Sequence, residues 1–199
     1  GMWAFAVWIP ARQTLFCARD RFGVKPFYLW HNSSSIAFAS EPKAILALRP
    51  ETRRVDESTL AAFLGQSDLY TGDRSFYEGI RVLPPAHCAQ WSAANGDLRM
   101  WRYWNYPSEP ARLQSPQHEI ETFTALLDDA VRIRLRSDVP VGLTLSGGLD
   151  STAVLTGAMK SGSQPLACFT SVYSSQERGE AGWAQRAAAP YGIQPIEVE

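Results

Sequence analysis

The sequence of 199 residues contains little that would indicate a metal site or a disulfide framework. Its three cysteines, Cys17, Cys88 and Cys168, are far apart and include no CxxC pair, which argues against both zinc and disulfide scaffolds. The three histidines are equally scattered, and none has a ligand-like neighbour four residues on. We therefore expect the cysteines to be small, buried side chains in strands.

The sequence also lacks an excess of either charge and any long apolar run. Its 19 basic and 20 acidic residues nearly balance, and no basic stripe points to nucleic acid or to a membrane surface. The apolar stretches are too short to span a bilayer, and the first residues do not resemble a signal peptide. We expect a cytoplasmic protein with packed cores, because 45% of its residues are hydrophobic.

The first part of the chain is rich in strand patterns. Pro42 suits the first turn of a short helix, and Asp56 is a plausible N-cap for another. The expected strands are 2–9, 15–19, 27–30, 36–39, 80–83, 86–91 and 98–103, and the expected helices are 42–48 and 57–64. This mixture predicts an α+β domain over residues 1–104.

A proline-rich segment, residues 105–116, is predicted to be a linker. A helix is expected at 117–136, with one apolar face made of Ile120, Phe123, Leu127, Ala130 and Val131. Beyond Pro140 the expected order is strand 141–145, helix 152–160, strand 167–172, helix 180–191 and strand 194–198. Strands that alternate with helices predict a doubly wound parallel sheet over 117–199, with apolar surface exposed near 194–199.

The string Ser-Gly-Gly-Leu-Asp-Ser at residues 146–151 falls between a predicted strand and a predicted helix. Open α/β sheets bind ligands at the carboxyl ends of their strands, and N–H groups at a helix start attract anions. Gly147 and Gly148 are expected to adopt positive φ and to let the backbone approach phosphate. Asp150 suits such a site if Mg²⁺ lies between its carboxylate and the phosphates. A glycine-rich turn that binds nothing is the simpler alternative.

The loop lacks the lysine of a Walker A motif and has instead the signature of ATP pyrophosphatases. Three further segments extend the likeness: ARDRFGVKPFY at 18–28, FASEPKAI at 38–45 and LPPAH at 83–87. Together with DVPVG at 138–142, they make the whole chain resemble glutamine-hydrolysing asparagine synthetases. The last of the three segments has Ala86 at the family's usual glycine. From the charges alone, we expect Asp20 to bridge neighbouring arginines.

The resemblance implies the end of an N-terminal-nucleophile glutaminase β-sandwich, followed by the start of an ATP pyrophosphatase domain. It implies activation of aspartate as β-aspartyl-AMP with release of pyrophosphate, and then amidation by ammonia from glutamine. ATP and Mg²⁺ would be required, aspartate and glutamine would be the other substrates, and a homodimer is possible. The implied ATP- and pyrophosphate-binding residues are Thr144, Ser146, Gly147, Gly148, Leu149, Asp150, Ser151 and Ser171, with Asp150 as the metal ligand.

The family's nucleophilic cysteine stands directly after the initiator methionine, whereas this chain begins with Gly1 and Met2. Cys17 has no nearby base or free amine, so no residue of this chain is expected to be a catalytic nucleophile. The chain is thus interpreted as a fragment that is inactive alone. Two other readings stay open: a relative with another acceptor, such as a β-lactam synthetase or lasso-peptide cyclase, and a nucleotide-binding chain without turnover.

Overall fold

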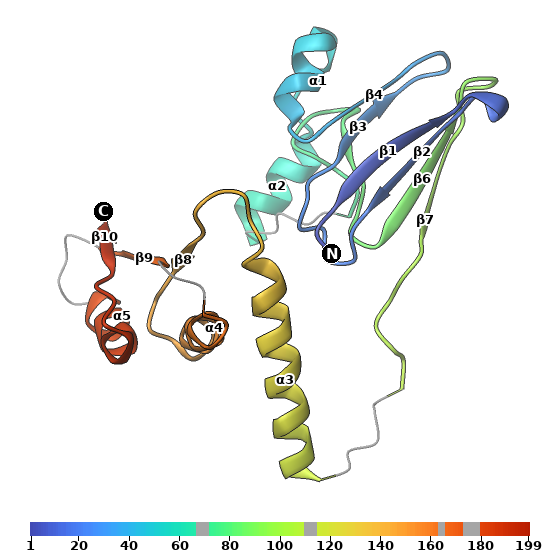
Figure 1. Cartoon of the computed structure of the whole chain (residues 1–199). Helices are drawn as coiled ribbons and strands as arrows, with labels where there is room; N and C mark the ends of the chain where they lie inside the picture. The colour runs from blue at the N-terminus through green and yellow to red at the C-terminus, as the bar shows by residue number, and fades with distance from the viewer. Residues whose placement is uncertain (67–71, 110–114, 163–165, 173–179) are drawn as a thin grey trace. The chain divides into compact units, whose positions relative to one another are not determined.

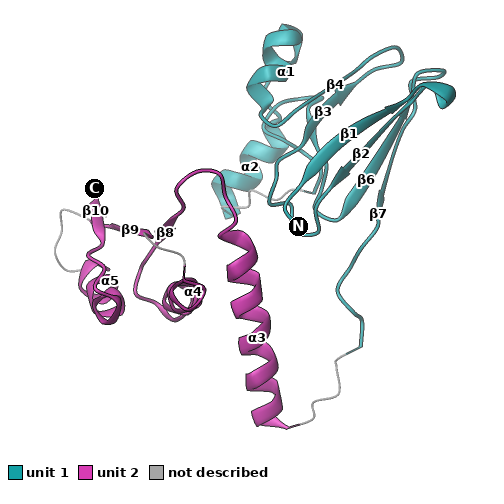
Figure 2. Cartoon of the chain, viewed as in Figure 1, with its two compact units in different colours: residues 1–109 teal, residues 110–199 magenta. Residues whose placement is uncertain are grey.

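The computed structural model describes residues 1–66, 72–109, 115–162, 166–172 and 180–199. The chain divides into two compact units, residues 1–109 and residues 110–199 (Figure 2). Each unit has its own hydrophobic core, so each is described by itself. Within the described residues, no helix combines the length and apolar character needed to cross a membrane.

Unit 1 contains two antiparallel sheets (Figure 1). The larger has the order β1-β2-β6-β7, with bounds β1 Ala4–Ile9, β2 Thr14–Arg19, β6 His87–Ser92 and β7 Leu98–Arg102. The smaller has the order β4-β3-β5, with bounds β3 Tyr28–His31, β4 Ile36–Ala39 and β5 Arg81–Val82. A 3₁₀ turn, η1 (Pro10–Arg12), connects β1 to β2.

The two sheets of unit 1 share one core. Inward side chains of the larger sheet, including Leu15, Cys17 and Trp91, belong to the same buried cluster as Phe27 and Leu29 from the smaller sheet. On the other side of the smaller sheet, α1 (Pro42–Leu48) buries Ile45 and Leu46, and a 3₁₀ turn, η2 (Pro50–Thr52), and α2 (Glu57–Gln66) follow it. All three cysteines of the chain are buried in strands, as predicted.

Unit 2 alternates helices with parallel strands. Its order is α3 (Pro116–Arg134), β8 (Gly142–Thr144), α4 (Leu149–Lys160), β9 (Ala167–Ser171), α5 (Ala181–Ala188), η4 (Ala189–Tyr191) and β10 (Ile196–Val198). The strands form a parallel sheet in the order β10-β9-β8, which confirms the parallel pairing predicted from the pattern. The helix expected over 180–191 is split, because Pro190 lacks the N–H needed to continue it and is the second residue of the 3₁₀ turn.

The helices of unit 2 cover one face of the parallel sheet (Figure 1). Leu145 and Cys168 point into a core made with Val131, Leu155 and Ala184 from the three helices. The side chains on the opposite face are exposed in the described part of the chain, namely Thr144, Phe169, Ser171, Ile196 and Val198. This confirms the apolar surface predicted near the last strand.

The apolar face predicted for α3 is only half buried. Val131 is 6% exposed and joins the core, whereas Ile120 and Phe123, two to three turns earlier, are 61% and 67% exposed. The spacing therefore identified the helix correctly, but only its second half, at Val131, joins the described core of unit 2.

Candidate functional site

The loop at residues 146–151 connects β8 to α4, as the sequence predicted. Gly148 is the N-cap of α4, and its carbonyl accepts the N–H of Thr152 at 3.0 Å. The helix therefore begins at Leu149, three residues before the expected start. Because of this, residues 149–151 form the first helical turn and their N–H groups lie at the positive end of the helix dipole.

Gly147 is the glycine that the loop geometry requires. Its φ is +76°, and a Cβ at this position would lie 2.3 Å from the carbonyl carbon of Trp183 and 2.6 Å from the nitrogen of Ala184. The loop thus packs directly against the backbone of the first turn of α5. Gly148, by contrast, has φ −72°, so the expectation of a positive φ there is wrong. Its N-cap role requires an extended backbone instead.

The two serine hydroxyls of the loop lie next to each other. Ser146 Oγ and Ser151 Oγ are 3.1 Å apart, and Ser146 Oγ also accepts the N–H of Gly148 at 3.3 Å. Ser151 Oγ donates to the carbonyl of Gly148 at 3.2 Å. These bonds fold the loop around its own hydroxyls, so that both serines face the same space.

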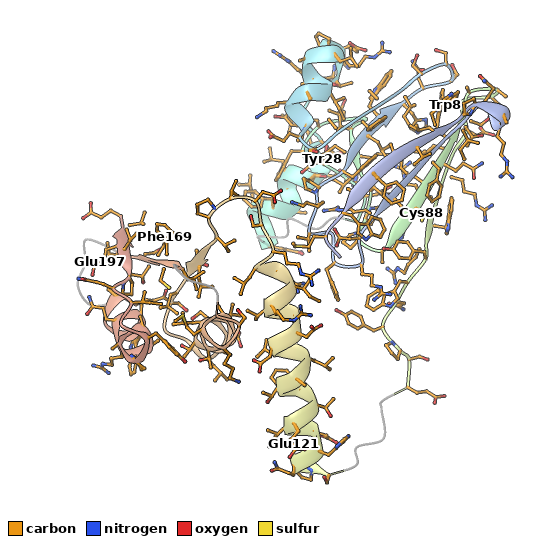
Figure 3. The ribbon with its side chains drawn as sticks, in the orientation of Figure 1. Trp8, Tyr28, Cys88, Glu121, Phe169 and Glu197 are labelled. Carbon is orange, nitrogen blue, oxygen red and sulfur yellow. The ribbon has the colours of Figure 1, made fainter. Side chains whose placement is uncertain are left out.

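That space is a cavity of about 360 Å³ at the carboxyl ends of the parallel strands. It is lined by Thr144, Leu145, Ser146, Ser151, Phe169, Thr170, Ser171, Glu180 and Val198. Four of the predicted site residues therefore meet here, although Ser171 is 20 residues beyond Ser151 in sequence. Figure 3 shows Phe169 on β9, the central strand of the sheet beneath this cavity.

The other four predicted residues do not line the cavity. Gly147 and Gly148 shape the loop through their backbone, and Asp150 lies exposed in the first turn of α4. Leu149 is 87% exposed and lines a separate groove between α3 and α4. Within the described ranges, no group of three or more His, Cys, Asp or Glu side chains could hold a metal ion by itself.

Sequence reasoning missed two polar residues of the cavity, Thr170 and Glu180. Thr170 is the fourth residue of β9 and is 3% exposed, and Glu180 directly precedes α5. Neither belongs to a recognisable motif. The one available signal was topological: residues that end a parallel strand or begin the following helix gather at the carboxyl edge of the sheet.

A second cavity, of about 400 Å³, lies between α3, α4 and β8. Its lining is apolar except for Arg134, whose guanidinium donates to the carbonyl of Ala130 in its own helix. The described residues of its lining include no cluster of hydroxyl or N–H donors for a phosphate. The cavity at the loop is therefore the better candidate for an anionic ligand.

In unit 1, the motif around Asp20 has a structural role. Asp20 is 1% exposed, and its carboxylate accepts the backbone N–H groups of Trp3, Phe22, Val24 and Lys25 at 3.0–3.3 Å. Burial alone would raise the pKa of Asp20, but these four donors lower it below its usual range. The carboxylate thus holds a backbone turn, where we had expected ion pairs with arginines.

Cys17 does not resemble a nucleophile. Its side chain is 1% exposed in the core between the two sheets, and burial raises the pKa of its thiol to about 12. The thiolate, which is the reactive form, is therefore scarce at neutral pH.

Comparison with known families assigns both units. Residues 1–104 match the model described as a glutamine amidotransferase domain, and residues 122–199 match the asparagine synthase model. The chain is 40% identical over 182 residues to the glutamine-hydrolyzing asparagine synthetase 3 of Bacillus subtilis (strain 168), which covers 89% of this chain and 29% of that protein.

Two other relatives extend the comparison. Glutamine-hydrolyzing asparagine synthetase 1 of the same Bacillus subtilis strain is 29% identical over 198 residues, covering 98% of this chain and 30% of that protein. Amidase chry2 of Gibberella zeae is 34% identical over 168 residues, covering 77% of this chain and 22% of that protein. The chain thus spans less than a third of the length of the relatives named here.

Proposed function

The chain belongs to the glutamine-hydrolysing asparagine synthetase family, and from this we propose that it contributes the phosphate-binding loop of an ATP-dependent amide ligase. The observation that supports this most directly is the cavity at the carboxyl edge of the parallel sheet. Loop hydroxyls and strand-end residues meet in it, and a helix begins beside it. Such an arrangement suits a nucleoside triphosphate.

We propose that Ser146 and Ser151 donate hydrogen bonds to the β- and γ-phosphates, together with N–H groups at the start of α4. The two hydroxyls already face one space, so binding would exchange their mutual contact for phosphate oxygens. Thr144 and Ser171 would lie along the adenosine part. Because these donors are positioned before the reaction, they would stabilise negative charge that develops on the leaving pyrophosphate.

Asp150 fits a Mg²⁺ ion that arrives with the nucleotide. Mg²⁺ in nucleotide sites is commonly held by one or two carboxylates, with phosphates and water completing its octahedron. Asp150 supplies one exposed carboxylate in the first turn of α4, adjoining the loop. When bound, the ion would neutralise phosphate charge, and the task of Asp150 would be to orient it.

The reaction that we propose for the whole protein has two steps. The β-carboxylate of aspartate attacks the α-phosphorus of ATP, which forms β-aspartyl-AMP and expels pyrophosphate. Ammonia from glutamine then attacks the acyl carbon and AMP leaves, so a poor leaving group has been replaced by a good one. In this scheme residues 1–104 belong to a glutaminase of the N-terminal-nucleophile sandwich type, and residues 117–199 begin a doubly wound pyrophosphatase domain.

The alternative that has an observation in its favour is an enzyme of the same family whose acceptor is not aspartate. The relative named amidase chry2 shares 34% identity with this chain, so the same scaffold occurs in a protein with a different name. The phosphate-binding role of the loop would be the same for either acceptor. The loop can therefore be tested without knowing the acceptor.

The test is calorimetric titration of the full chain with Mg·ATP, for the wild type, Asp150→Asn and Asp129→Asn. Asp129 is an exposed residue of α3 paired with Arg132, so its substitution makes the same charge change outside the loop. We expect Asp150→Asn to weaken Mg·ATP binding about tenfold or more, while Asp129→Asn binds as the wild type does. Absence of binding by a folded wild type, or equal loss in both variants, would contradict the proposal.

A further inference from the structure

The most buried polar residue in the lining of the cavity is Thr170, whose hydroxyl has no partner among the described residues. Thr170 is 97% buried, because its exposed fraction is 3%. Its Oγ1 has no hydrogen-bond partner among the residues that the structure describes, yet the residue lines the cavity. Buried hydroxyls are nearly always hydrogen-bonded in folded proteins. An unpaired hydroxyl in the wall of a cavity therefore points to a ligand that would supply its missing hydrogen bond.

Glu180, which carries a carboxylate, also lines the cavity. The backbone carbonyl of Glu180 accepts the N–H groups of Trp183 at 3.0 Å and Ala184 at 2.9 Å, which fixes this residue at the start of α5. Its side chain makes no capping bond to that helix, and the residue lines the cavity. The same first turn of α5 packs against Gly147, so the loop and Glu180 are held in one rigid arrangement.

The residues that line the cavity thus offer two different chemistries. The loop offers hydroxyl and N–H donors, which suit phosphate. Glu180 offers acceptor oxygens, which would repel phosphate but accept hydrogen bonds from neutral donors. Thr170 is joined to the loop through the sheet, because the N–H of Leu145, next to Ser146, donates to the carbonyl of Phe169, next to Thr170, at 2.7 Å.

We propose that Thr170 and Glu180 bind the ribose hydroxyls of the nucleotide. This inference rests on the proposed phosphate-binding role of the loop. The ribose adjoins the α-phosphate, so in ATP bound at the loop it would lie beside the phosphates in the same cavity. Its two hydroxyls can donate to the Glu180 carboxylate and also exchange a hydrogen bond with Thr170 Oγ1. The pair would give the site a preference for ribonucleotides over dideoxynucleotides.

The 6-amino group of adenine is a second possible donor to Glu180, and a metal ion is a third possible partner. The ligands of the experiment separate these cases. They are Mg·pyrophosphate, Mg·ATP, Mg·2′,3′-dideoxyATP and the Mg complex of purine riboside triphosphate, which lacks the 6-amino group. Each is titrated into the full wild-type chain and into Glu180→Gln, Thr170→Val, Thr170→Ser and Glu121→Gln. Glu121 lies on α3 outside the cavity and provides the matched charge control (Figure 3).

We expect the wild type to bind dideoxyATP about tenfold more weakly than ATP. Glu180→Gln and Thr170→Val should weaken ATP binding by a similar factor and change dideoxyATP binding little. Thr170→Ser and Glu121→Gln should bind ATP as the wild type does, and pyrophosphate binding should be the same in all five proteins.

Thr170→Val has a second readout. Removing an unpaired buried hydroxyl should leave the melting temperature of the ligand-free chain unchanged or raise it. A hydroxyl with a structural role would lower it instead, so a lowered melting temperature would contradict the proposal.

Three other outcomes would overturn the ribose assignment. If Glu180→Gln weakens pyrophosphate binding as much as ATP binding, Glu180 acts on the metal or the phosphates. If the effect of Glu180→Gln disappears with purine riboside triphosphate and persists with dideoxyATP, the base is the partner. If ATP binding is unchanged, Glu180 has no role in the site. Failure of the wild type to bind pyrophosphate would instead refute the proposed function itself.

Discussion

Two polar turns of this chain each contain aspartate and glycine, and they differ in what their hydrogen-bonding groups do. The turn around Asp20 in unit 1 is closed: its carboxylate is buried and is saturated by four backbone N–H groups. The loop at residues 146–151 in unit 2 is open: its two hydroxyls contact each other beside a cavity, and nearby Thr170 Oγ1 is unpaired in the described residues. The difference separates a turn that stabilises its unit from one that is available to a ligand.

The largest effect is expected when Gly147→Ala is compared with Gly148→Ala. A methyl group at residue 147 combines a positive φ with a 2.3 Å approach to the Trp183 backbone, so α5 must shift away. We expect a loss of about 3 kcal/mol or more in the free energy of unfolding of unit 2. Gly148→Ala meets only Ser146 Oγ, at 3.4 Å, and should cost less than about 1 kcal/mol.

Hydrogen exchange read by mass spectrometry at increasing urea separates the two units. Peptides from residues 142–160 should lose protection in Gly147→Ala, while those from residues 87–102 should keep it. Equal stability of the two glycine variants would show that the loop does not depend on its contact with α5.

Asp20→Asn tests the closed turn. The substitution removes the charge and places an amide among N–H donors, so we expect unit 1 to lose about 1.5–3 kcal/mol of unfolding free energy. The control is Glu41→Gln, since Glu41 pairs with Lys43 at the surface, where both side chains are more than half exposed. That variant should lie within about 1 kcal/mol of the wild type. Urea denaturation gives both values, and equal losses would contradict the assigned role of Asp20.

A smaller effect is the pH dependence of the difference in unfolding free energy between wild type and Asp20→Asn. Its sign follows from the direction of the pKa shift. Because the pKa of Asp20 is lowered in the folded chain, its stabilising contribution is complete above the unfolded pKa of about 3.9. It is lost as the pH falls from there towards the folded pKa. The difference in unfolding free energy between wild type and Asp20→Asn should therefore be constant from pH 7 to 5 and shrink towards pH 3. A difference that grows on acidification would be inconsistent with this assignment.

The local signals of the sequence predicted much of the fold. Strand 36–39 and helix 42–48 agree with the structure to the residue, because the helix has Pro42 in its first turn and the strand is bounded by polar turns. The chain also has a left-handed residue at Ala86, φ +59°, which accounts for the glycine that is usual at this position in the family. The loop was located correctly because a glycine pair between a strand and a helix is a local signal.

The remainder of the site depends on tertiary contacts. Thr170 and Glu180 reach the cavity because β9 pairs with β8 and α5 packs against Gly147, and neither contact is encoded near these residues. The same limit explains α3, whose apolar face was recognised although Ile120 and Phe123 are exposed. Periodicity indicates which face of a helix is apolar, but not how far its partner extends.

The buried thiols have a kinetic consequence. Cys17 and Cys88 lie in unit 1 and Cys168 in unit 2, and burial raises the pKa of all three. At a pKa of about 12, Cys17 would be present as thiolate to only about one part in 10⁵ at pH 7. Alkylation by iodoacetamide must therefore wait for each unit to open. The modification rate of Cys17 therefore reports the opening of unit 1, and that of Cys168 reports the opening of unit 2.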